Sequence, residues 1–97
     1  MDLYCYLVTY DISSPKRWRR VYQTLLGFGE HVQLSVFRCD LTAPRFVRLK
    51  MALEKHIHHK EDQVILVKLG RSSAQVIEGI EVLGRPHEFE PPGATIV

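Results

Sequence analysis

One carboxylate stands where an apolar run meets a turn, and this placement could support metal or ligand chemistry. Residues 3–12 (LYCYLVTYDI) are rich in apolar, β-branched and aromatic side chains and predict an interior strand. Asp11 closes this strand just before Ser13, Ser14 and Pro15, which favour a turn. Proteins that combine strands and helices often place ligands and metals at such strand ends. Asp11 is therefore the candidate site residue; the alternative is that it orders the turn through an Asx-type hydrogen bond.

A cluster of cations follows directly, at positions where folding alone would not place it. Ser14 can cap and Pro15 can begin a helix over about residues 16–26, whose apolar side chains fall at helical spacing. Cations near a helix N-terminus oppose the helix dipole and cost roughly 0.3 to 1 kcal/mol each. Phosphate binding explains this placement better than the alternative, a solvated basic face. The cations are Lys16, Arg17, Arg19 and Arg20.

Composition and charge narrow the class of protein. The 97 residues suffice for one domain with a two-layer core. No apolar stretch approaches the roughly 20 residues that span a bilayer, and the first residues lack the features of a signal peptide, so we expect no membrane association and a cytoplasmic location. Residues 1–60 carry ten Lys and Arg against five Asp and Glu, whereas residues 61–97 carry three against six. The basic part is the candidate surface for a polyanion such as RNA or DNA.

The rest of the chain alternates predicted strands and helices. Residues 30–39 predict one strand, or two short strands joined by a bend near Ser35. Thr42 can cap a second helix that has an apolar stripe at helical spacing. Residues 63–69 (QVILVKL) and 80–83 (IEVL) predict further strands. A proline-rich tail from Arg85 then leads to a last strand-like segment, residues 94–97.

This order of elements predicts an α+β fold, a ferredoxin-like βαββαβ sandwich with an extra C-terminal strand. We expect a ferredoxin-like domain over residues 1–84 and an extended arm over residues 85–97, whose short strand packs on a partner subunit. Two helices would cover one face of the sheet and leave the other face for a homodimer contact. We expect the tyrosines of the first strand, Tyr10 among them, to face outward there, as a dimer interface or a platform for stacked bases.

Four segments together resemble the CRISPR-associated Cas2 family. They are YDIS at residues 10–13, KRWRRV at 16–21, LLGFG at 25–29 and, above all, VQLSVFRCDL at 32–41. The resemblance implies a ferredoxin-like homodimer whose C-terminal strand packs on the sheet of its partner. It also implies a role in CRISPR spacer acquisition, in which the dimer bridges the Cas1 integrase and holds the incoming DNA. A metal-dependent endonuclease activity on single-stranded RNA or double-stranded DNA is implied as well.

The resemblance also assigns roles to single residues. Asp11 corresponds to the metal-binding acid of the family and is thus the candidate catalytic residue. Many members carry Arg where this chain has His31, so a phosphate contact there would be weaker and would depend on pH. Arg17 and Arg20 correspond to basic helix positions of the family. The full set of nucleic-acid-binding candidates is Lys16, Arg17, Arg19, Arg20, His31 and Ser35, and the residues expected to support the fold or the dimer are Tyr10 and Phe37.

The metal site implied by the resemblance would have to be shared between subunits. Mg²⁺ is usually held by one or two carboxylates together with water and substrate phosphate. Each chain offers only Asp11 at a suitable position, because Asp2 lies at the terminus and Asp40 at the far end of another strand. We therefore expect two Asp11 side chains to share one Mg²⁺ across the dimer axis. Two alternatives stay open: a non-catalytic DNA-binding scaffold, and a toxin endoribonuclease of the VapD type, which shares the fold and the dimer.

Overall fold

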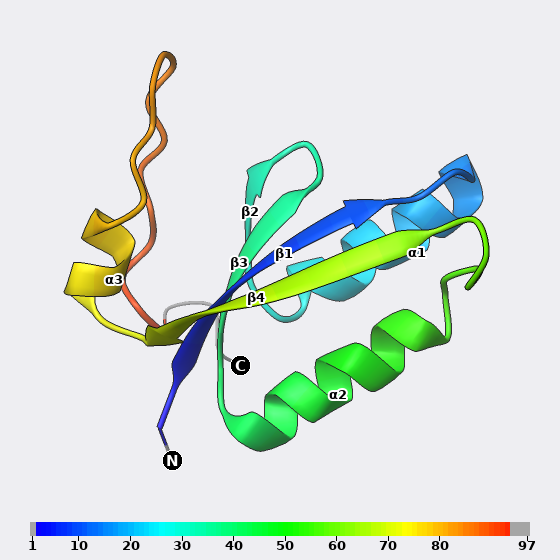
Figure 1. Ribbon diagram of the computed structural model, residues 1–97, viewed down its shortest axis with the longest axis horizontal. Helices are drawn as coiled ribbons and strands as arrows, with labels where there is room; N and C mark the ends of the chain where they lie inside the picture. The colour runs from blue at the N-terminus through cyan, green and yellow to red at the C-terminus, as the bar shows by residue number, and fades with distance from the viewer. Residues whose placement is uncertain (1, 94–97) are drawn as a thin grey trace.

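The computed structural model describes residues 2–93, which form a four-stranded antiparallel sheet and three helices. The strands are β1 (Tyr4–Asp11), β2 (Glu30–Gln33), β3 (Val36–Leu41) and β4 (Gln63–Arg71). The helices are α1 (Pro15–Leu26), α2 (Ala43–Glu54) and the short α3 (Ala74–Glu78). The strands lie in the order β2-β3-β1-β4, so β1 is interior, as its apolar pattern predicts (Figure 1). Over the described residues, no helix has the length and apolar character needed to cross a membrane.

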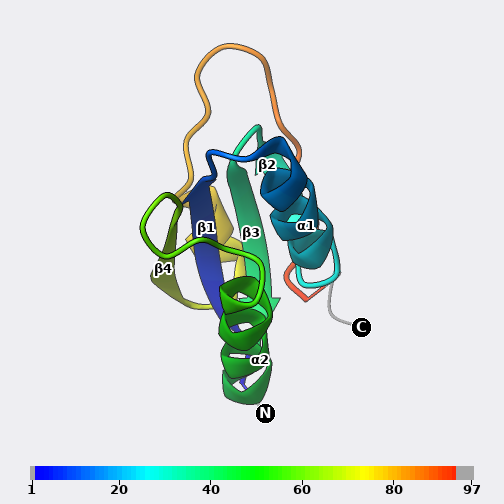
Figure 2. The same ribbon diagram turned by 90° about the vertical axis from the view of Figure 1, so that its right-hand side faces the viewer.

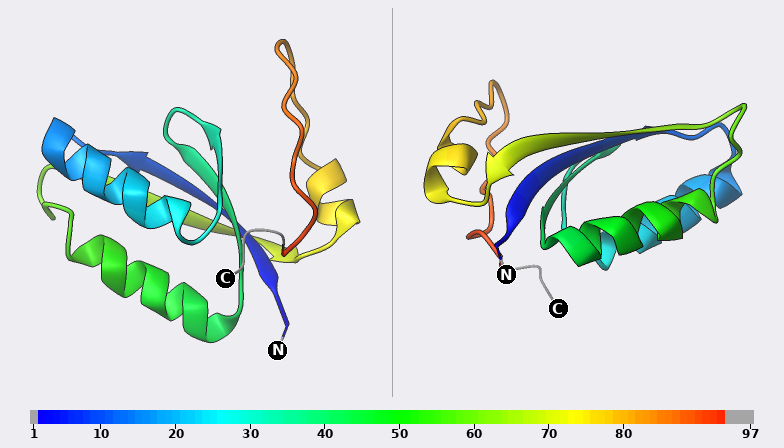
Figure 3. Two further views of the ribbon diagram at one scale, coloured as in Figure 1. Left: turned by 180° about the vertical axis from the view of Figure 1, so that it is seen from behind. Right: turned by 60° about the horizontal axis from the view of Figure 1, so that its bottom comes forward.

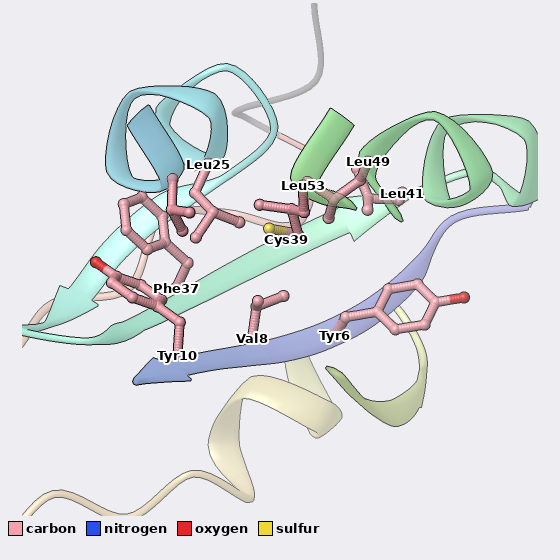
Figure 4. Packing of buried hydrophobic residues seen from close by; sticks show 10 residues of the cluster. Tyr6, Val8, Tyr10, Leu25, Phe37, Cys39, Leu41, Leu49 and Leu53 are labelled. Carbon is pink, nitrogen blue, oxygen red and sulfur yellow. The ribbon is translucent and has the colours of Figure 1, made fainter. Parts of the chain in front are cut away.

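The two long helices begin where the sequence predicts, because each has a side-chain cap followed by a proline. The Ser14 hydroxyl accepts a hydrogen bond from the Arg17 amide at 3.3 Å, and the Thr42 hydroxyl accepts one from the Arg45 amide at 3.4 Å. Both helices pack on the same face of the sheet, and the other face has neither of them (Figures 2 and 3). We call this second face the open face. The core fills the space between the two helices and the sheet (Figure 4).

The expectation that the tyrosines of β1 face outward is wrong. Tyr6 and Tyr10 are each only 5% exposed and point toward the helices (Figure 4). The Tyr6 ring stacks on Phe46 of α2 with centroids 4.1 Å apart, and the Tyr10 ring lies 6.4 Å from that of Trp18 of α1. Alternation along a strand predicts two faces but not which one the helices cover. Here the aromatic side chains of the helices pack on the tyrosine face. Tyr10 is therefore a core residue, and Leu7 lies on the open face.

Residues 80–83 do not form the strand that their composition predicts. Helix α3 precedes them in the chain. The Ser73 hydroxyl caps this helix by accepting a hydrogen bond from the Val76 amide at 3.2 Å. After α3 the chain leaves the body of the molecule in a long excursion before it returns (Figure 1). Strand propensity is realised only where side chains pack against a neighbouring strand. In the described structure this segment has no such neighbour, and Leu83 is 96% exposed.

The described part of the C-terminal arm, residues 85–93, returns to β2 and β3 of its own chain. The Arg38 guanidinium donates to the Glu90 carbonyl at 3.0 Å, and the Glu90 amide donates to the Glu30 carboxylate at 3.3 Å. The Gly93 amide donates to Asp40 at 3.0 Å. These bonds hold the backbone of the arm, so they do not depend on its side chains. The strand expected at residues 94–97 lies outside the described residues.

The side chains that hold the arm form a buried charge cluster of Glu30, Arg38 and Asp40. The guanidinium of Arg38 is fully buried, 2.9 Å from Asp40 and 3.2 Å from Glu30. Ser72 also donates to Asp40 at 2.7 Å. A charge taken out of water is tolerated only when it is paired and hydrogen-bonded. The cluster therefore fixes β2, β3 and the arm relative to one another.

Candidate metal and nucleic-acid site

Asp11 lies at the end of β1 on the open face, and its side chain is exposed. It pairs in register with Gln63, the first residue of β4. It also lines a hollow of about 210 Å³, together with Ser35 and Val36 beside the β2–β3 turn and Ile65 of β4. The hollow therefore brings together the carboxylate of Asp11 at the end of β1, the hydroxyl of Ser35 beside the β2–β3 turn and the side-chain amide of Gln63 at the start of β4.

Tyr10 shapes this hollow although its ring lies in the core. The Tyr10 hydroxyl donates to the Leu34 carbonyl at 3.1 Å, and the Tyr10 amide donates to the Ser35 carbonyl at 3.1 Å. Burial raises the pKa of the Tyr10 hydroxyl to about 12, so the hydroxyl keeps its proton and donates near neutral pH. The β2–β3 turn is thereby fixed beside Asp11, and Ser35 stays at the rim of the hollow.

The donor set at Asp11 fits a hard cation such as Mg²⁺ only in part. Carboxylate, hydroxyl and amide oxygens are ligands that Mg²⁺ accepts. Among the described residues that line the hollow, Asp11 is the single carboxylate. Residues 2–93 also contain no group of three or more His, Cys, Asp or Glu side chains arranged to hold a metal. The residues present therefore suit an ion that takes further ligands from water, from a substrate phosphate or from a second subunit.

The cations of α1 lie on the other side of the sheet from Asp11. Lys16, Arg19 and Arg20 are exposed on α1, which covers the helical face. The first turn of α1 has no acidic residue. The structure therefore places these three candidates where a polyanion can reach them, but does not bring them into the hollow at Asp11.

Arg17 differs from its neighbours because it is engaged within the chain. Its guanidinium donates to Asp62 through Nε at 2.7 Å, and to Glu61 at 3.1 Å. Asp62 immediately precedes β4, and its side chain is fully buried. Sequence reasoning missed this partner, since Asp62 belongs to no motif and lies 45 residues from Arg17.

The Asp62 carboxyl gives the fold a specific pH dependence. Hydrogen bonds, first of all from Arg17, hold the pKa of Asp62 far below its ordinary value of 3.8. Because the folded-state pKa is the lower one, ionised Asp62 stabilises the fold above about pH 4, and this contribution is lost as the pH falls through the folded-state pKa. We expect the difference in unfolding free energy between wild type and Asp62→Asn to be constant above about pH 5 and to shrink below about pH 4. Urea denaturation at a series of pH values measures it; a difference unchanged at about pH 2 would contradict the assignment.

His31 and Phe37 lie side by side on the helical face. The rings are 5.1 Å apart, and both lie edge-on to Tyr22 of α1, at 5.3 Å for His31 and 5.5 Å for Phe37. Phe37 is fully buried, and its expected role in supporting the fold or the dimer stays a prediction. His31 is exposed beside α1, close to the basic helix and away from Asp11.

Comparison with known proteins defines the class. The family model for CRISPR associated protein Cas2 matches residues 4–76 of this chain. The solved structure of Streptococcus pyogenes Cas2 is similar with a TM-score of 0.73 and 34% sequence identity, over 82% of this chain and 99% of that chain. The small α+β fold with its four-stranded antiparallel sheet is thus one that Cas2 structures share.

Two proteins of similar sequence agree with this match. The chain is 41% identical over 94 residues to CRISPR-associated endoribonuclease Cas2 1 of Rhodospirillum rubrum, covering 97% of this chain and 91% of that protein. It is 43% identical over 65 residues to CRISPR-associated endoribonuclease Cas2 of Geobacter sulfurreducens, covering 67% of this chain and 68% of that protein. The chain belongs to the Cas2 family.

Proposed function

We propose that this protein is a homodimeric endonuclease with a ferredoxin-like fold, which uses Mg²⁺ to cleave phosphodiesters of single-stranded RNA or double-stranded DNA. The observation that carries the proposal is the exposed Asp11 carboxylate on an open sheet face. The strand order β2-β3-β1-β4 with antiparallel pairing supports the ferredoxin-like assignment. The names of the two relatives, both endoribonucleases, support the activity. The family relationship also favours a cytoplasmic location.

The open face supplies a surface for the proposed dimer. Ile65, Val67 and Leu69 of β4 are exposed apolar side chains there, and Leu7 of β1 lies beside Val67 in the register. Contiguous exposed apolar side chains mark interaction surfaces. A twofold contact through this face would cover them and would bring two Asp11 carboxylates toward one another. On this proposal residues 1–84 form the domain, and residues 85–97 form the arm that also reaches the partner subunit.

The residues at the site would divide the chemistry between them. Mg²⁺, when bound, polarises the scissile phosphate and lowers the pKa of a coordinated water. Each chain supplies one carboxylate, so the Asp11 side chains of both subunits would hold this ion on the dimer axis. Ser35 and Gln63 offer hydrogen bonds to phosphate or water at the rim of the hollow. Lys16, Arg19 and Arg20 would bind other phosphates of the same nucleic acid, at a distance from the scissile bond.

A charge placed on the open face tests the dimer. We expect Val67→Glu to weaken the dimer at least about tenfold, because the contact would bury an unpaired carboxylate. Cleavage should fall in parallel at protein concentrations where the variant is a monomer. Val47→Glu is the matched control, because Val47 is 49% exposed on α2 and Val67 is 43% exposed on β4. Sedimentation equilibrium measures the dimer dissociation constant of each variant. Equal constants for the two variants would exclude this face as the interface.

The exposed cations of α1 predict the salt dependence of binding. Removing Arg19 and Arg20 together should weaken binding to double-stranded DNA and reduce the slope of log K against log salt by up to about two, because up to two phosphate contacts are lost. Arg17→Ala should leave the slope unchanged, since the Arg17 guanidinium is already paired with Asp62 and Glu61. Fluorescence anisotropy titrations over a range of salt concentrations measure the slopes. If Arg17→Ala reduced the slope and the removal of Arg19 and Arg20 did not, these assignments would be reversed.

We place this activity in CRISPR spacer acquisition, with the dimer bridging the Cas1 integrase. The family match supports this role over the VapD-type toxin. The second candidate function is a scaffold that holds DNA without cleaving it. The separation of the exposed α1 cations from Asp11 favours this candidate, because binding and cleavage would then use different surfaces. DNA binding that survives Asp11→Ala, together with cleavage that does not depend on Mg²⁺ or Asp11, would leave the scaffold as the function.

A further inference from the structure

We infer that Asp62 and Arg17 form a positioning pair that fixes the Asp11 carboxylate, and that Arg17 does not bind phosphate. The inference rests on the proposed function, because it assumes that Asp11 acts at the site. It concerns the turn between β1 and α1, where Asp11 is followed closely by Ser13 and Ser14. Nothing in the sequence pattern around Asp62 suggests such a role.

The contacts at Asp62 join three separate segments. One carboxylate oxygen of Asp62 accepts from the Ser13 amide at 3.0 Å and from the Ser13 hydroxyl at 3.2 Å. The other oxygen accepts from Arg17 Nε at 2.7 Å and from the His58 amide at 2.8 Å. Arg17 also donates to the Ser13 hydroxyl at 3.2 Å. The pair therefore ties the turn after β1, the first turn of α1 and the loop before β4 together.

The main chain at Asp11 is held from two sides by this arrangement, and its side chain is positioned through the main chain. On one side Asp11 pairs in register with Gln63, which follows Asp62 directly in the chain. On the other side Ser13, two residues after Asp11, is bonded to Asp62 through both its amide and its hydroxyl. A metal ligand needs a fixed position and orientation. Substituting a residue that orients such a ligand therefore changes activity, although the residue does not touch the substrate. Asp62 is thus placed to orient Asp11 without lining its hollow.

The local charge argues against phosphate binding by Arg17. The guanidinium is shared between two carboxylates, Asp62 and Glu61, so the three side chains together carry a formal net charge of −1. A phosphate approaching Arg17 would meet both carboxylates and would have to compete with a 2.7 Å hydrogen bond. Lys16, Arg19 and Arg20 are exposed, by contrast, and form no ion pair within the described residues.

The test compares Arg17→Ala, Asp62→Ala and the double variant, each in the full chain. Positioning predicts that either single change lowers kcat about tenfold to a hundredfold, and that the double variant falls no further, because both changes break one unit. The affinity for an uncleavable single-stranded RNA without Mg²⁺ should stay within about twofold of wild type, and Arg17→Lys should restore part of kcat. Arg71→Ala, which breaks an exposed pair with Asp2, is the matched control and should change none of these values.

The opposite pattern would overturn the inference. If Arg17 binds phosphate, Arg17→Ala weakens RNA affinity, Asp62→Ala strengthens it by freeing the guanidinium, and the two effects are additive. A second measurement separates this inference from the proposed function. Amide exchange followed by NMR without metal should show a faster-exchanging Ser13 and a shifted Asp11 signal in both single variants. An unchanged Asp11 signal in both would refute the positioning role, whereas an Asp11→Ala protein that cleaves normally would refute the proposed function itself.

Discussion

Replacing Asp11 by alanine should reduce Mg²⁺-dependent cleavage of RNA or DNA by more than about a hundredfold. Asp11 is the carboxylate of the hollow on the open face, and loss of a ligand should cost more than the tenfold to hundredfold typical of residues that only orient one. The fold should be unaffected, because the Asp11 side chain is exposed. Labelled single-stranded RNA and double-stranded DNA, each with and without Mg²⁺, measure the change and identify the preferred substrate.

A matched control and a check of assembly and stability make the Asp11 experiment decisive. Asp2→Ala is the matched control, because Asp2 is an exposed carboxylate whose partner is Arg71 and which lies outside the hollow. It should cleave like wild type. Both variants must first be shown to be dimers with the wild-type melting temperature. Cleavage that is equal in wild type and Asp11→Ala would show that another group holds the metal or that the protein is a scaffold.

Replacing Arg38 by alanine should destabilise the protein by about 3 to 5 kcal/mol. The change leaves Asp40 and Glu30 as buried carboxylates without their cation, and the penalty for a buried unpaired charge is of this size. It also removes the donor that holds the Glu90 carbonyl and the cation that orders Glu30 and Asp40, which accept from the Glu90 and Gly93 amides, so the arm should detach more readily from the sheet. Urea unfolding followed by circular dichroism measures the loss of stability, and limited proteolysis in residues 85–93 measures the release of the arm.

The control for Arg38 is Arg71, whose pair with Asp2 is exposed. Arg71→Ala should change the unfolding free energy by less than about 1 kcal/mol, since solvent screens an exposed ion pair. Arg38→Met is a second comparison, because it fills the space but still leaves two carboxylates unpaired. If Arg38→Ala and Arg71→Ala were equally mild, the buried cluster would not be holding the arm.

Local patterns predicted much of the fold. The helix caps at Ser14 and Thr42, the interior position of β1 and the order of the six main elements follow from short-range rules of capping and alternation. Other features do not follow from such rules. Alternation predicts that the tyrosines of β1 share a face but cannot say that the helices cover this face. The composition of residues 80–83 predicts a strand, but propensity does not reveal whether a neighbouring strand exists, and no pattern indicated the short helix α3 before them.

The positions of the candidate residues were predictable where they depend on neighbours in the chain. The strand that ends at Asp11 and the helix that begins with the cations follow from local patterns, whereas the roles of these residues stay predictions. The partner of Arg17 could not be found in this way, because Asp62 is distant in the sequence and is brought near only by the pairing of β1 with β4. Arg38 and Asp40 were likewise hidden in a strand that looked apolar, and only the packed structure shows that they are buried.

The arrangement of the two surfaces suggests how binding and cleavage would be divided. Exposed cations lie on α1, on the helical face, whereas Asp11 lies on the open face. In the proposed dimer through the open face, the two Asp11 carboxylates would lie at the interface and the cations of both chains on the outside. Binding by these cations and cleavage at Asp11 would then be separable.

Metal stoichiometry tests the central claim most directly. Mn²⁺ can replace Mg²⁺ at oxygen sites, and its binding to the purified dimer can be counted by electron paramagnetic resonance. The shared site predicts one tightly bound ion for each pair of chains, and loss of this ion in Asp11→Ala while the dimer persists. One ion bound to every chain, or an ion retained in Asp11→Ala, would contradict a metal shared between two Asp11 carboxylates.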